Sequence, residues 1–192
     1  MGVKKASLFR RAALTLIAGA AVFAPSVAKA DLLEGLSLRV GGFIPQRDVI
    51  RDVTDFVAWG GGIDYKIPWF PNVFSGEHWA TSISADVHYS ERKAGILRSI
   101  PVSINQIYTF EEQNGVSPFA GICFTAVTFG GTQNLGGGVT ARQPTVTRFG
   151  GGLILGANWG DHLYIEGRYE WFDPHGAVAP PEGFRTYVGW RF

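Results

Sequence analysis

Hydrophobic and polar residues alternate along most of the chain after residue 30, and the alternation is sharpest at its end. Within 184–192, one parity carries the apolar and aromatic residues, together with Thr186. These residues are Phe184, Thr186, Val188, Trp190 and Phe192. The other parity carries Arg185, Tyr187, Gly189 and Arg191. Because successive side chains of a strand point to opposite faces, the segment predicts a strand with one apolar face and one basic face.

The segment 163–172 shows the same division with charges of alternating sign. Glu166, Arg168 and Glu170 share one face, and the opposite face is apolar and aromatic. In a hollow barrel such charges neutralise one another across the lumen, and Arg185 and Arg191 of the next strand can join them. A polar interior inside an apolar wall is typical of membrane barrels. The alternative is a surface strand of a soluble sandwich with a charged outer face.

Six earlier segments have strand character and are separated by turn-forming residues. They are 36–45, 56–67, 80–91, 96–110, 117–130 and 145–159. Each of the eight strands has about nine residues or more, which suits a tilted crossing of a bilayer, and an even number closes without a free edge. We therefore expect an all-β fold, an eight-stranded antiparallel up-and-down transmembrane β-barrel. With a periplasmic N-terminus, the outward connections are 46–55, 92–95, 131–144 and 173–183, and the glycine-rich third one is expected to be a mobile exposed loop.

The first thirty residues have the pattern of a secretory signal peptide. Lys4, Lys5, Arg10 and Arg11 precede an apolar run over 12–23, and Ala28-Lys29-Ala30 forms a small-x-small cleavage site. We expect a signal peptide at 1–30 and one barrel domain at 31–192. The segment holds five of the 17 basic residues and none of the 16 acidic ones, so the mature chain has a formal charge of −4. That balance offers no basic stripe for nucleic acid.

Metal and cofactor chemistry find little support in the sequence. Cys123 is the single cysteine, so no disulfide can form within the chain, and we expect it to be a packing residue. His78, His162 and His175 have no ligand spacing to a second His or Cys. We therefore expect no metal site and no cofactor. The first outward connection carries four charged residues, Asp48, Arg51, Asp52 and Asp55. They could bind cations, or lipopolysaccharide through bridging divalent ions. A solvated charged loop is the simpler interpretation.

Two longer motifs resemble the OmpA-like outer-membrane β-barrel domain family of small eight-stranded proteins. The first is Ile100-Pro101-Val102-Ser103-Ile104-Asn105 followed by Ser117-Pro118-Phe119-Ala120-Gly121, and the second is Phe149-Gly150-Gly151-Gly152 followed by 160–169. The resemblance covers most of the mature chain and implies localisation in the outer membrane. Glu166 and Arg168 take places that commonly bear lumenal charges there. Cys123 departs from the family pattern, and we expect no peptidoglycan-binding domain after the barrel.

The resemblance also implies partners. The apolar face that ends at Phe192 resembles the signal recognised by the barrel-assembly machinery, and Phe184, Val188 and Trp190 belong to that face. Outer-membrane lipids and lipopolysaccharide are the implied surroundings, and extracellular ligands could bind the loops. Family members range from structural anchors to adhesins and small-solute pores, so the resemblance leaves the activity open.

One enzymatic hypothesis depends on His88-Tyr89-Ser90-Glu91. His88 and Ser90 lie on one face of a strand, and a carboxylate that orients the imidazole would make an activated hydroxyl nucleophile. Lipid A 3-O-deacylases, another family of small barrels, use such a His-x-Ser pair. Here the pair shares its parity with Asp86 and hence with the lumen, whereas Glu91 has the opposite parity.

Three functions therefore remain to be compared. The first is a non-enzymatic barrel with a structural role in envelope integrity or a surface-interaction role. The second is a lipid A-modifying enzyme that uses His88 and Ser90. The third is a narrow pore for small solutes, which is disfavoured because an eight-stranded barrel is barely wide enough for its own side chains. The charges expected to fill its lumen are Asp64, Asp86, Glu166, Arg168, Glu170, Arg185 and Arg191.

Overall fold

The structure, a computed structural model, describes residues 34–51, 56–68, 74, 76–92, 94–137, 139–174 and 179–192. The expected signal peptide at 1–30 lies outside the described residues. Gly35–Phe192 forms one compact unit. No helix in the described part of the chain is long and apolar enough to cross a membrane.

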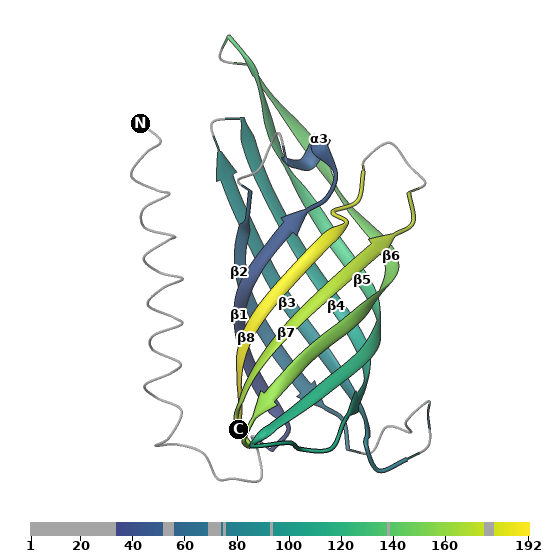
Figure 1. Ribbon diagram of the computed structural model, residues 1–192. Coiled ribbons are helices and arrows are strands. Elements are labelled where there is room, and N and C mark those ends of the chain that lie inside the picture. Colours follow the sequence, from purple (N-terminus) through teal and green to yellow (C-terminus); the bar gives the residue numbers. More distant parts are fainter. Residues whose placement is uncertain are drawn as a thin grey trace. The chain divides into compact units, whose positions relative to one another are not determined.

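Eight antiparallel strands form a closed barrel in which each strand pairs with its neighbour in sequence and the last pairs with the first (Figure 1). The strands are β1 Leu36–Pro45, β2 Ala58–Lys66, β3 Trp79–Arg92, β4 Gly95–Thr109, β5 Val116–Gly136, β6 Val139–Trp159, β7 Leu163–Phe172 and β8 Gly183–Arg191. A short helix, α3 Asp48–Arg51, follows β1. The predicted eight-stranded up-and-down barrel is thus confirmed.

The outer wall of the barrel is apolar, as the alternation of the sequence predicts. Aliphatic and aromatic side chains of every strand point outward and remain exposed, for instance Ile83, Val102 and Leu155. Exposed aromatic residues gather toward both ends of the wall, which matches the aromatic girdles at the two interfaces of a bilayer. At the outer end, where the β5–β6 hairpin rises, these are Trp59, Tyr169, Trp171 and Phe184; at the inner end they are Tyr65, Phe110, Trp159 and Trp190.

Glycine in β2 allows the strands of this narrow barrel to approach closely. A Cβ atom added at Gly62 would lie 2.2 Å from the carbonyl oxygen of Ala85 and 2.2 Å from Oδ1 of Asp86. Any side chain at this position would therefore displace backbone atoms or an interior carboxylate. The glycine run of β2 leaves room for the polar interior next to it.

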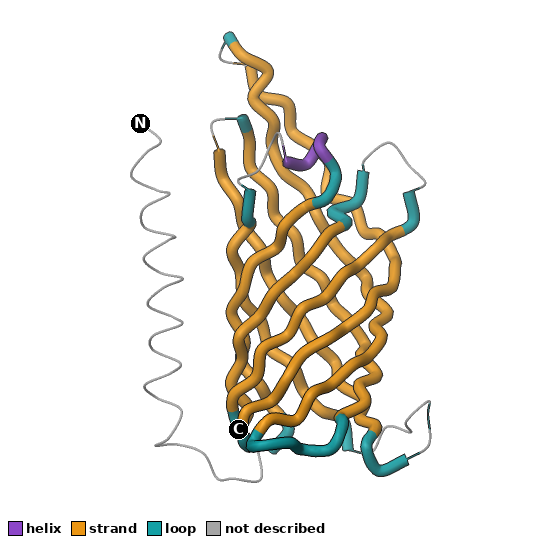
Figure 2. Tube along the Cα trace, viewed as in Figure 1, coloured by secondary structure: helices purple, strands orange, loops and turns teal. Residues whose placement is uncertain are grey.

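The third outward connection differs from the prediction. Residues 131–136 and 139–144 are not a loop, because β5 and β6 continue as a paired hairpin beyond the neighbouring strands (Figure 2). Its ladder pairs Gly131 with Gln143 and Asn134 with Thr140, with two register shifts. Positive φ at Gly136 places glycine at the turn rather than along a loop. The polar residues flanking the glycines gave no apolar alternation, although their backbone forms a regular ladder.

Candidate functional site

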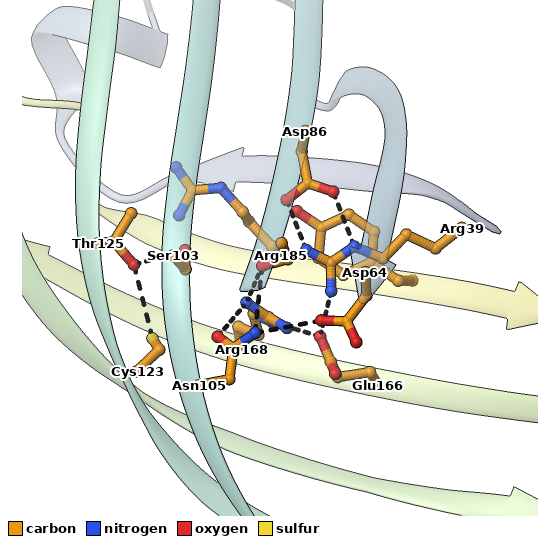
Figure 3. Close-up of polar contacts among 12 residues, drawn as sticks. Arg39, Asp64, Asp86, Ser103, Asn105, Cys123, Thr125, Glu166, Arg168 and Arg185 are labelled. Atoms are coloured by element: carbon orange, nitrogen blue, oxygen red, sulfur yellow. Dashed lines mark hydrogen bonds and ion pairs between the residues drawn. The ribbon is translucent and has the colours of Figure 1, made fainter. Parts of the chain in front are cut away.

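A network of buried ion pairs fills the middle of the barrel, and Arg39 of β1 is its central cation. Its Nε and Nη2 atoms donate to the two carboxylate oxygens of Asp86 at 2.7 and 2.6 Å (Figure 3). Its Nη1 atom donates to Oε1 of Glu166 at 3.3 Å. The planar guanidinium thus binds one carboxylate on β3 with both arms and reaches a second one on β7.

Arg168 of β7 extends the network toward β3 and β4. It forms a close ion pair with Glu166 and donates to Oδ1 of Asn105 at 3.0 Å. The amide nitrogen of Asn105 donates in turn to Asp64 at 3.2 Å, and the hydroxyl of Ser82 donates to the same carboxylate at 2.9 Å. Side chains of β1, β2, β3, β4 and β7 are therefore joined at one level of the barrel.

A second group of polar residues lies closer to the outer end. Arg185 of β8 forms an ion pair with Glu170 of β7, and both side chains are buried. The hydroxyl of Thr125 donates to Oε1 of Glu170 at 3.1 Å and is 2.8 Å from the hydroxyl of Ser103. Cys123 is a free, buried thiol whose Sγ atom lies 3.7 Å from the same carboxylate oxygen.

The ring of Tyr187 on β8 lies near two guanidinium groups, and its hydroxyl lies near His88. The guanidinium carbon of Arg39 lies 4.3 Å from the ring centroid, and that of Arg168 lies 5.9 Å from it. The Tyr187 hydroxyl is 3.2 Å from Nε2 of His88, whose ring is in turn close to that of Phe43. Cation–π contacts therefore help to fix the two guanidinium groups.

Large buried side chains occupy the interior of the barrel, among them Arg168, Arg185, Tyr187 and Phe43. A cavity of about 30 Å³ lies at the inner mouth, which is room for ordered water but not for a solute. Its walls include Asp64, Phe119, Asn158, Tyr164, Glu166 and Arg191. At the outer mouth, Ile50 of α3 packs with three buried apolar side chains of the strands, which are Phe43, Ala58 and Leu97.

The structure places six of the seven expected lumenal charges within these two groups. Asp64, Asp86, Glu166, Arg168, Glu170 and Arg185 are all in the interior. Arg191 differs, because it is half-buried at the inner mouth, where it donates to Oδ1 of Asn158 at 3.4 Å and lies over the ring of Tyr164. Among the described residues it has no carboxylate within 4.0 Å, so it stands apart from the ion-pair network.

The sequence reasoning missed Arg39, although the signal was present. Arg39 shares its parity with Ser37, Gly41 and Phe43, and the structure turns this face inward. The neighbouring glycines weaken the alternation of β1, so the face of a lone arginine was not assigned.

The residues of the enzymatic hypothesis face the interior. His88 is fully buried and Ser90 is 4% exposed, so neither side chain reaches the lipid-facing wall. Glu91 is exposed and accepts a hydrogen bond of 2.7 Å from the hydroxyl of Tyr89. The structure therefore does not assemble these three residues into a site on the face where an acyl chain would lie.

The residues of the expected assembly signal lie on the outer wall of β8. The side chains of Phe184, Val188 and Trp190 are exposed there. Phe192 follows β8, is half-buried, and donates its backbone N–H to the carbonyl oxygen of Leu36 at 3.0 Å. Together they form the apolar face that the alternation predicts.

Charged contacts join the first outer connection to the last one and lie within α3. Nε of Arg47 donates to Glu182 at 2.9 Å, and this hydrogen bond raises the pKa of the Arg47 guanidinium. Asp48 and Arg51 form an ion pair within α3. The acidic residues at 52 and 55, considered above for cation binding, lie outside the described residues.

Within the described residues, no cluster of three His, Cys, Asp or Glu side chains could hold a metal ion.

Comparison with known proteins supports the fold. The chain matches no protein-family model and no curated protein. Among solved structures, Neisserial surface protein A (NspA) is similar with a TM-score of 0.54 and 13% identity, covering 82% of this chain and 96% of that one. The N-terminal β-barrel domain of Pseudomonas aeruginosa OprF has a TM-score of 0.48 and 13% identity, covering 83% of this chain and 98% of that one. The outer membrane enzyme PagL has a TM-score of 0.48 and 14% identity, covering 82% of this chain and 97% of that one.

The chain thus has the fold of the small eight-stranded outer-membrane barrels. The closed barrel and the apolar wall with aromatic residues at both ends are those of an outer-membrane protein. The class and the localisation predicted from the sequence are confirmed at this level.

Proposed function

We propose that this protein is a non-enzymatic barrel that contributes to the integrity of the outer membrane and presents its β5–β6 hairpin to the exterior. One observation carries the proposal, namely the buried ion-pair network in the lumen. Arg39, Arg168 and Arg185 pair with the interior carboxylates Asp86, Glu166 and Glu170, and each of these side chains is at most 4% exposed. A closed, cross-linked interior suits a rigid membrane anchor better than a pore.

The hairpin supports the second half of the proposal. β5 and β6 have 21 residues each, about twice the length of β7 and β8. Their paired backbone holds the tip well above the aromatic girdle, with Leu135 and Val139 exposed there. A regular ladder carries these residues with less loss of conformational freedom on binding than a loop would. The hairpin is therefore a suitable contact surface for other molecules of the cell envelope.

A deletion strain tests the envelope role. We expect loss of the gene to increase sensitivity to a detergent and to a large hydrophobic antibiotic, and plasmid-borne wild-type protein to restore resistance. A variant in which a two-residue turn replaces 131–144 separates the two halves of the proposal, because it keeps the barrel and lacks the hairpin. Unchanged sensitivity of the deletion strain would remove the envelope role.

The enzymatic alternative needs its own measurement. We expect the mass spectrum of lipid A to be the same with and without expression of the protein. A loss of acyl chains on expression that disappears in His88→Ala and Ser90→Ala would overturn the proposal. The buried positions of both side chains speak against that result.

A further inference from the structure

Two arginines stand on the outer wall of the barrel above its apolar belt. Arg98 of β4 and Arg142 of β6 are both exposed. Arg98 alternates with buried Leu97 and Ser99, so it points away from the lumen. Ile96 has the same outward parity on β4 as Arg98, and it pairs with Thr132 of β5. Thr132 pairs in turn with Arg142 of β6. Because paired residues of neighbouring strands point to the same face of a sheet, Arg142 also points outward.

The two arginines lie close enough to act on one ligand. Strand β5 lies between them, so they are two strand spacings apart. Along the strands they are offset by two residues, because Arg98 pairs with Gly130 and Arg142 pairs with Thr132. The usual spacings place their Cα atoms about 12 Å apart. Small residues of β5 lie between them, Gly130 opposite Arg98 and Thr132 opposite Arg142. The long side chains can therefore converge over β5 or bind two anionic groups side by side.

The height of the pair on the wall matches that of lipid headgroups. Arg98 pairs with Tyr89 across the β3–β4 ladder, and its guanidinium carbon lies 5.9 Å from the centroid of that ring. Exposed Ile100, two residues toward the inner end, already belongs to the apolar belt. Arg98 thus lies next to the outermost of the exposed apolar residues of β4, where interfacial tyrosines and arginines are expected.

Both guanidinium groups are available for a ligand. Among the described residues, no carboxylate lies within 4.0 Å of either one. Glu91 on β3, an exposed acid, accepts a hydrogen bond from the hydroxyl of Tyr89. By contrast, Arg39, Arg47 and Arg51 are each paired with a carboxylate.

We propose that Arg98 and Arg142 form a binding site for the phosphate groups of an outer-leaflet glycolipid, with its acyl chains against the apolar wall below. The proposal deepens the envelope role and rests on the outward placement of the hairpin end. Guanidinium groups bind phosphate through paired, charge-assisted hydrogen bonds. A lipid so bound is held by the wall and by the base of the hairpin, which joins the barrel to its neighbours in the leaflet.

The test measures binding of purified lipid A, phosphorylated or enzymatically dephosphorylated, to the full mature protein folded in detergent. We expect wild-type protein to prefer the phosphorylated form and R98Q/R142Q to bind it about 25-fold more weakly, since each surface arginine contributes about fivefold. R98K/R142K keeps the charge and should retain most of the affinity. R51Q, which removes an exposed arginine elsewhere, should bind as wild type.

Three results would overturn the proposal. The first is equal binding of both lipid A forms by the wild type, and the second is wild-type affinity in R98Q/R142Q. Displacement of lipid A by inorganic phosphate at equal concentration would also overturn it, because the site would then take free phosphate rather than a headgroup. Failure here leaves the envelope role testable, since the drug sensitivity of the deletion strain is measured separately.

Discussion

Replacing Arg39 with methionine tests whether the buried ion-pair network holds the barrel together. The two hydrogen bonds to Asp86 place opposite charges about 4 Å apart, which at an effective dielectric constant of about 20 corresponds to about 4 kcal/mol of attraction. Methionine keeps most of the volume and leaves Asp86 buried without its cation. Glu166 keeps Arg168 as a partner. We expect R39M to lower the free energy of unfolding by about 3–5 kcal/mol.

A double-mutant cycle separates the ion pair from mere loss of packing. D86N removes the stranded charge, so R39M/D86N should be more stable than the sum of the single changes predicts, by about 2 kcal/mol or more. Unfolding by urea in lipid vesicles, followed by tryptophan fluorescence and by the heat-modified mobility of the folded band, measures all four proteins. Additivity within about 0.5 kcal/mol, or a cost of R39M below about 1 kcal/mol, would refute the reasoning.

Three further predictions follow from the wall, the glycines and the terminus. Val102→Arg, near the middle of the apolar belt, should cost about 2–4 kcal/mol in vesicles, whereas Val139→Arg at the hairpin tip should cost less than about 0.5 kcal/mol. Gly62→Ala should lower the free energy of unfolding by about 1–3 kcal/mol or prevent folding. Gly151→Ala is the matched control, because its added Cβ has no contact under 3.2 Å, and it should cost less in the same unfolding assay. Deletion of Phe192 should lower the assembled amount in cells, measured by heat-modified mobility, while refolding in detergent stays efficient; equal loss in both settings would contradict a recognition role.

The sequence predicted the fold well where alternation is strong. The expected bounds of β1 and β7 match the structure, and those of β3, β4 and β8 differ from it by one residue at each end. The bounds of β5 and β6 failed at the outer end, because polar residues there form a ladder that faces solvent on both sides. Without a lipid face, such a strand has no apolar alternation to detect.

The interior was predicted only in part, because alternation gives the face of a residue but not its depth along the barrel. Arg191 has the parity of Arg185, yet it lies at the inner mouth beside Asn158, away from the buried carboxylates. Arg39 has the right face but stands in a glycine-rich strand with weak alternation. Which arginine meets which carboxylate depends on the stagger of the eight strands, and a single sequence does not show it.

The most direct test of the closed interior is planar-bilayer conductance of the refolded wild-type protein. The network formed by Arg39, Asp86, Glu166 and Arg168, with the Arg185–Glu170 pair above it, predicts no stable conductance steps. R39M/D86N offers a comparison in which the network is opened at its centre. Reproducible single-channel steps of uniform conductance from the wild-type protein would contradict the closed lumen that we propose for this barrel.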